Sequence, residues 1–148
     1  MVRTSRKNVR SNNMSNITGK ARSNRFRVNN YFAFKQWADG LDLVVYPDDD
    51  EQSRYVWISA ELQDTGTWPT TRLNLETEEH DEINFTQELG FHLDAGSVAV
   101  LFEIANTELQ YVGGIAVAVN RAGSCRISLE DIYTIAQGMG DEILRIDG

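Results

Sequence analysis

The sequence predicts an α+β fold, with a mainly antiparallel sheet of about five to seven strands and two or three helices packed mostly on one face. Short turns join most of the alternating apolar segments, and strands joined by short turns pair antiparallel. Three other segments repeat their apolar residues with the period of a helix. The chain has 148 residues, which suits one domain, and 41% of them are hydrophobic, which suffices for a core.

The first half of the chain carries two helix signals and several strand signals. Asn30 suits the N-cap of a helix that Gly40 would close. Asn84, with Gln87 three residues later, has the form of a capping box and begins a second helix with an apolar stripe at Phe85 and Leu89. Strands are expected at residues 25–28, 41–46 and 55–62, with a short one at 73–75.

The second half predicts three strands and a helix. Residues 98–104 are nearly all apolar, which is typical of a central strand covered on both faces. Residues 111–119 form its partner, in which Ala116 and Ala118 make one face small enough for a helix to approach. A strand at 125–127 follows, then a helix capped by Ser128. Its apolar residues are expected to be buried, and a last edge strand is expected at 143–146.

The charge of the chain is unevenly placed. Residues 1–25 hold seven bases and no acid, whereas residues 26–148 hold the other seven bases and all 22 acids, a net charge of −15. The first segment is also rich in Asn and Ser and poor in apolar residues, so it is expected to form a disordered basic arm. The rest is expected to form a single acidic α+β domain, residues 26–148.

Cysteine content and hydropathy limit where and how the chain works. Cys125 is the only cysteine, which excludes an internal disulfide and a site of several cysteines. No apolar run is long enough to span a membrane, and no apolar region follows the basic N-terminus as in a secretory signal. We therefore expect a cytoplasmic protein without a membrane partner.

The acidic body favours a non-enzymatic binding protein whose partner is a protein with a basic surface. Long-range attraction would speed the encounter with such a partner. One version is a nucleic-acid mimic that inhibits a nucleic-acid-binding protein. The residues expected to form the partner-binding surface are Asp48, Asp49, Asp50, Glu51, Glu76, Glu78, Glu79, Asp81 and Glu82. Trp68, beside Pro69 in a loop, is a candidate exposed anchor.

A second hypothesis is attachment to nucleic acid through the basic arm. Its bases would contact phosphates, and the affinity would then fall steeply with salt. The bases expected to do so are Arg3, Arg6, Lys7, Arg10, Lys20, Arg22 and Arg25.

A third and weaker hypothesis is a small enzyme. Its candidate groups are His80 within an acidic run, His92 on the apolar side of the second helix, and Glu103 inside an apolar strand. None of them belongs to a motif with the spacing of a metal site, a phosphate loop or a catalytic triad. No catalytic residue, metal or cofactor is therefore expected.

Overall fold

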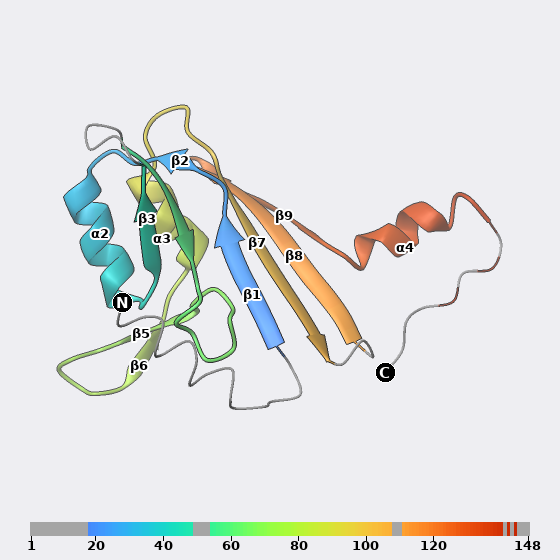
Figure 1. Ribbon diagram of the computed structural model, residues 1–148, viewed down its shortest axis with the longest axis horizontal. Helices are drawn as coiled ribbons and strands as arrows, with labels where there is room; N and C mark the ends of the chain where they lie inside the picture. The colour runs from blue at the N-terminus through green and yellow to red at the C-terminus, as the bar shows by residue number, and fades with distance from the viewer. Residues whose placement is uncertain (1–17, 49–53, 108–110, 141, 143, 145–148) are drawn as a thin grey trace.

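The computed structural model describes residues 18–48, 54–107, 111–140, 142 and 144 (Figure 1). Its helices are α2 (Tyr31–Gly40), α3 (Phe85–His92) and α4 (Asp131–Ala136). Its strands are β1 (Thr18–Ser23), β2 (Phe26–Arg27), β3 (Val44–Pro47), β4 (Tyr55–Ser59), β5 (Thr71–Leu73), β6 (His80–Glu82), β7 (Ala99–Thr107), β8 (Tyr111–Asn120) and β9 (Gly123–Ser128).

Seven of these strands form one antiparallel sheet, which confirms the predicted fold class. Six of them follow the order β2-β4-β1-β7-β8-β9, and the seventh, β3, lies off this path and also pairs with β4. The two remaining strands, β5 and β6, form a separate two-stranded hairpin. In Figure 1 the long strands β7, β8 and β9 run beside β1, and the hairpin lies at the lower end of the molecule.

The two longer helices begin at the predicted caps. The side-chain oxygen of Asn30 accepts a hydrogen bond from the Ala33 N–H, and that of Asn84 accepts one from the Gln87 N–H. These bonds satisfy N–H groups that a helix leaves unpaired at its start. Gly40, however, does not make the predicted left-handed cap. The positive φ falls two residues later, at Asp42, where φ is 55°.

The core lies between one face of the sheet and the helices α2 and α3. Phe34 of α2 and Leu89 of α3 are fully buried. They belong to one apolar cluster with side chains from β2, β4, β7 and β8, namely Phe26, Val56, Ile58, Ala99, Leu101, Val117 and Val119. This side of the sheet therefore supplies most of the apolar burial that stabilises the fold.

Strand β1 shortens the predicted arm. The sequence predicted disorder up to residue 25, but residues 18–23 pair with β7 along their whole length, and Arg22 also pairs with Ser59 of β4. Ala21 and Ser23 face the core and are 7% and 1% exposed. The Ser23 hydroxyl accepts a hydrogen bond from the Ile58 N–H at 2.9 Å. The prediction was wrong for residues 18–25, while residues 1–17 lie outside the described part.

Two predictions of burial in the C-terminal half were wrong. Strand β7 is covered on one face only, because Phe102 and Ile104 are 48% and 53% exposed on the other. The apolar residues of α4 are also exposed: Ile132 is 57% and Ile135 is 64% exposed. Figure 1 shows α4 projecting away from the sheet, so it covers neither face. Of the strand predicted at residues 143–146, the structure describes only Leu144, which lies outside any strand.

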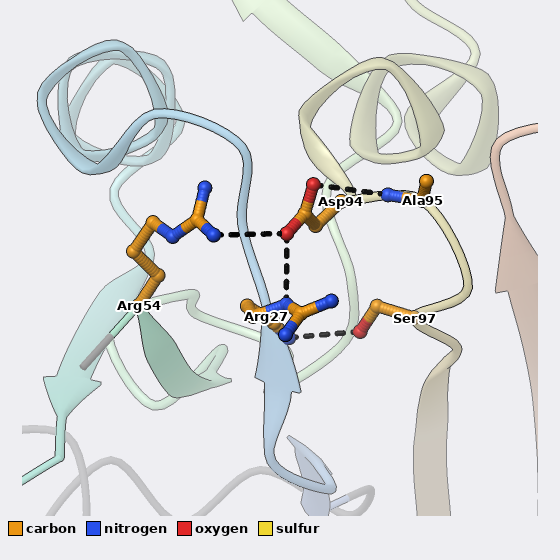
Figure 2. Close-up of polar contacts among 5 residues, drawn as sticks. All are labelled: Arg27, Arg54, Asp94, Ala95 and Ser97. Atoms are coloured by element: carbon orange, nitrogen blue, oxygen red, sulfur yellow. Dashed lines mark hydrogen bonds and ion pairs between the residues drawn. The ribbon is translucent and has the colours of Figure 1, made fainter.

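A carboxylate ties three segments together at the edge of the core (Figure 2). Asp94, just after α3, places its Oδ2 2.8 Å from Arg27 Nε of β2 and 3.2 Å from an Arg54 terminal nitrogen. Its Oδ1 accepts a hydrogen bond from the Ala95 N–H at 3.0 Å, and the Ser97 hydroxyl accepts one from the Arg27 N–H at 2.8 Å. This network fixes the loop that leads from α3 into β7.

No helix within the described ranges is both long enough and apolar enough to cross a membrane.

Candidate functional site

Residues Thr71–Glu82 form an exposed hairpin, here called the acidic hairpin. Its turn is shaped by Asn74, whose side-chain oxygen accepts hydrogen bonds from the N–H groups of Glu76 and Thr77 at 2.9 and 3.3 Å. Glu78 lies in the same turn, and its backbone is in the left-handed region, with φ of 61°. Asn favours such turns because its short amide side chain forms hydrogen bonds with backbone N–H groups nearby. A polar run thus forms an ordered hairpin without apolar burial of its own.

The hairpin presents five acids to solvent. Its members are Glu76, Glu78, Glu79, Asp81 and Glu82, and all of them are exposed. Asp81 accepts a hydrogen bond from the Asn74 side-chain amide at 3.0 Å. Among the described residues, no ion pair involves any of the five acids. The base within the hairpin, Arg72, turns instead to Glu88 of α3.

The other bases of the body are engaged elsewhere. Arg27 and Arg54 both pair with Asp94, and Lys35 pairs with Asp39 within α2. With Arg72 included, four of the six bases that the structure describes after residue 25 are in ion pairs, and none of these pairs involves one of the five hairpin acids. Within the described residues, therefore, no ion pair neutralises the five acids of the hairpin.

Of the nine acids predicted to form one surface, the structure describes six, and these lie in two places. Asp48 follows β3, at the opposite end of the sheet from the acidic hairpin (Figure 1). It forms an ion pair with Arg25 at 3.4 Å. Residues 49–51, which complete the predicted Asp-Asp-Asp-Glu run, lie outside the described residues. Among the six acids that are described, the structure brings together the five of the hairpin.

The predicted basic arm is likewise divided. Lys20 and Arg22 lie on β1, where Arg22 stacks over the Trp57 ring with its guanidinium carbon 4.0 Å from the ring centroid. Tyr46 stacks on the same ring at 3.9 Å between centroids. Arg25 faces Asp48. The other four bases, Arg3, Arg6, Lys7 and Arg10, lie outside the described residues.

Trp68 is not the exposed anchor that its place beside Pro69 suggested. It is 8% exposed and stacks on Phe85 at 5.6 Å between ring centroids. Its backbone N–H donates to a Glu103 carboxylate oxygen at 3.0 Å. Glu103 is half-buried and holds the loop before β5 against the sheet, which gives this acid a structural role in the fold.

The residues considered for catalysis lie in separate environments. His92 packs between Phe34 and Trp37, with ring centroids 5.8 and 5.1 Å away. Burial lowers the pKa of His92, and the nearby Glu88 carboxylate opposes that change. His80 lies exposed in the acidic hairpin, and Glu103 bonds to the Trp68 backbone. The packing of His92 between two aromatic rings fits a core histidine better than a general base with an orienting carboxylate.

A depression of mixed polar and apolar lining opens between α3 and the turn that joins β8 to β9. Its lining includes Asn84, Gln87, Asn120, Arg121 and Ser124, but not His80, His92 or Glu103. Among the residues that the structure describes, no three His, Cys, Asp or Glu side chains are grouped so that they would hold a metal ion.

No family model matches the chain, and neither a curated protein nor a solved structure was found to be similar to it.

Proposed function

We propose that the protein is a non-enzymatic binding protein that engages a basic protein surface through its acidic hairpin. The observation that carries this proposal is the set of five exposed acids at residues 76–82 that take part in no ion pair of the described chain. Exposed carboxylates that form no ion pair within the protein attract cations from outside the molecule.

The electrostatics support an encounter with a cationic partner. Residues 18–148, which include β1, hold all 22 acids and ten bases, a net charge of −12, so their field attracts a basic protein over a distance of about one Debye length, about 8 Å at physiological salt. At contact, Lys and Arg side chains of the partner can form charge-assisted hydrogen bonds with the hairpin carboxylates. The turn at Asn74 holds these acids in order before binding, which lowers the entropy cost of association.

Mimicry of nucleic acid is the narrower version of the proposal. It needs carboxylates in an extended row on one exposed face, and within the hairpin it would draw on the exposed Glu76, Glu78 and Glu79 at the turn and Glu82 on β6. Asp81 pairs in register with Arg72, on the other side of the strand from its neighbours His80 and Glu82. The general proposal of a basic protein partner does not depend on this narrower version.

The proposal is tested by titrating the full chain into a fluorescent lysine- and arginine-rich peptide and following anisotropy. The hairpin variant Glu76→Gln/Glu79→Gln removes two charges from the turn. The control variant Asp64→Asn/Glu142→Gln removes two charges from exposed positions outside the hairpin. We expect the hairpin variant to weaken binding about tenfold and the control by less than about threefold, because specific contacts add to the general field. Equal losses in the two variants would show that only net charge matters and would overturn the assignment of the hairpin.

The nucleic-acid hypothesis is tested by the same titration with a labelled oligonucleotide. A chain that begins at Thr18 keeps β1 and removes Arg3, Arg6, Lys7 and Arg10. If the full chain binds the oligonucleotide with an affinity that falls with salt, and the shortened chain does not, the bases before β1 are a nucleic-acid tether. If neither chain binds, this alternative is removed.

A further inference from the structure

One face of the sheet is apolar and open. It lies opposite the helices α2 and α3 and is here called the open face. The register places Phe102 of β7 beside Ala116 of β8, and Ala116 beside Ile127 of β9. One row further along, Ile104 lies beside Gly114, whose backbone oxygen accepts a hydrogen bond from the Leu129 N–H at 2.9 Å. The four large side chains are exposed by 48% for Phe102, 53% for Ile104, 61% for Ile127 and 50% for Leu129.

The open face has the shape that receives a helix. Ala116 and Ala118 are alternate residues of β8, so they share this face and form a lane of small side chains. Leu129 lies over Gly114 at one end of this lane, because a Cβ on Gly114 would be only 3.1 Å from the Leu129 Cδ1. The large residues of β7 and β9 stand on either side of the lane. A helix that lies along it would bury both rows of large side chains while its backbone approaches β8 closely. Contiguous exposed apolar surface of this kind marks an interaction site on a protein.

The same chain carries an unpartnered apolar helix. On α4 and the turn that follows it, Ile132, Ile135 and Met139 recur at helical spacing and are 57%, 64% and 85% exposed. The helix starts directly after β9, the edge strand, and Figure 1 shows it directed away from the sheet. Within one chain, therefore, the apolar side of α4 does not reach the open face.

The charges of the two surfaces are complementary. Lys20 and Arg22 lie on β1 in the rows of Ile104 and Phe102, so two bases border the open face. No acid occupies the positions that these rows contribute from β1, β7, β8 and β9. Residues 127–144, which include α4, contain four acids and no base. An α4 segment that crosses the lane toward β1 would bring its acids toward these bases.

We propose that the open face binds α4 of a second copy of this chain, in a symmetric dimer that exchanges its C-terminal helices. Each copy carries both halves of the contact, so a two-fold axis generates two identical helix-to-face contacts and closes the assembly. The dimer buries Phe102, Ile104, Ile132 and Ile135 together, and places the exposed Cys125, on the open face beside Ala118, under the partner's helix.

The test is the mass of the full chain in solution, by light scattering or sedimentation velocity across a concentration series. Ile135→Asp alters the helix, and Ala118→Arg blocks the lane from an exposed position without touching the core. Each is expected to raise the dimer dissociation constant about tenfold or more, as for a residue central to an interface. Phe32→Asp, at an 82% exposed position on α2, is the matched control and leaves the mass unchanged. Circular dichroism checks that every variant keeps its fold.

A mixing experiment separates helix exchange from any other dimer. The Ile135→Asp chain keeps an intact open face, and the Ala118→Arg chain keeps an intact α4, so a mixture restores one of the two contacts. We expect a heterodimer in the mixture at concentrations where each variant alone is monomeric. A wild-type chain that stays monomeric at about 100 µM overturns the proposal, because a contact that weak is not a stable assembly. A dimer that neither variant weakens, or variants that fail to complement each other, overturns it as well.

Discussion

Removing the charge of Asp94 tests whether the network in Figure 2 stabilises the fold. The substitution Asp94→Asn keeps the shape of the side chain and the oxygen that accepts the Ala95 N–H at 3.0 Å. It deletes the negative charge that lies 2.8 Å from Arg27 and 3.2 Å from Arg54. Two like charges are then left together at the junction of β2, the start of β4 and the loop after α3.

The size of the effect follows from the exposure of the three side chains. Asp94 is 21% exposed, whereas Arg27 and Arg54 are 39% and 48% exposed. Breaking a fully buried pair costs about 3–5 kcal/mol, and an exposed pair contributes at most about 1 kcal/mol. The partial exposure here places the loss in the free energy of unfolding at about 1–2 kcal/mol, or about 2–8 °C in Tm for a chain of this length.

Urea denaturation followed by tryptophan fluorescence measures this loss at low and at high salt. The difference between Asp94→Asn and the wild type should shrink as salt rises, since salt screens partly exposed charges. Asp39→Asn is the control, because Asp39 pairs with Lys35 on the surface of α2 and its loss should cost about 0.5 kcal/mol or less. A loss for Asp94→Asn no larger than that of the control, or one that does not depend on salt, would refute this reasoning.

Three further predictions concern the fold. A chain that starts at Thr18 should unfold at the same urea concentration as the full chain, whereas one that starts at residue 26 should not fold, since it lacks the strand between β4 and β7; circular dichroism distinguishes the two. Because burial lowers the pKa of His92, its protonation favours the unfolded chain, so stability should fall as pH drops below the ordinary value of 6.5. His92→Gln should reduce this fall in urea titrations. Gly90→Ala should destabilise by about 1–2 kcal/mol in urea unfolding, because the new Cβ would lie 3.0 Å from the backbone oxygen of Asn120, the last residue of β8, whereas Gly40→Ala has open space and should not destabilise.

The parts of the fold that the sequence predicted are those with a local cause. Asn30 and Asn84 cap their helices because the amide side chain bonds to an N–H three residues ahead, and both residues are visible as such in the sequence. Strand β1 has no such signal. Its residues Thr-Gly-Lys-Ala-Arg-Ser show no apolar alternation, and Ala21 and Ser23 are buried only because β4 and β7 lie on either side.

The errors of burial have one physical origin. Apolar patterns at Phe102 and Ile104 on β7, and at Ile132 and Ile135 on α4, indicate surfaces that avoid water, but not the chain against which they pack. The structure leaves both surfaces exposed on a single copy, which is the observation behind the proposed helix exchange. For the candidate site, the sequence predicted that the acids of residues 76–82 form one surface with Asp48 and residues 49–51, and the structure shows that the acids of residues 76–82 are exposed. Asp48 follows β3, whereas the hairpin acids lie on β6 and at its turn. This separation depends on the topology of the fold, which the local sequence does not reveal.

The most direct test of the acidic hairpin as a partner-binding site is a ¹H–¹⁵N NMR titration of the full chain with the lysine- and arginine-rich peptide. Binding through the hairpin predicts that the amide shifts concentrate on residues 71–82 and disappear in the Glu76→Gln/Glu79→Gln variant. Shifts spread over many exposed acids, or centred on β7, β8 and β9, would contradict the proposed function.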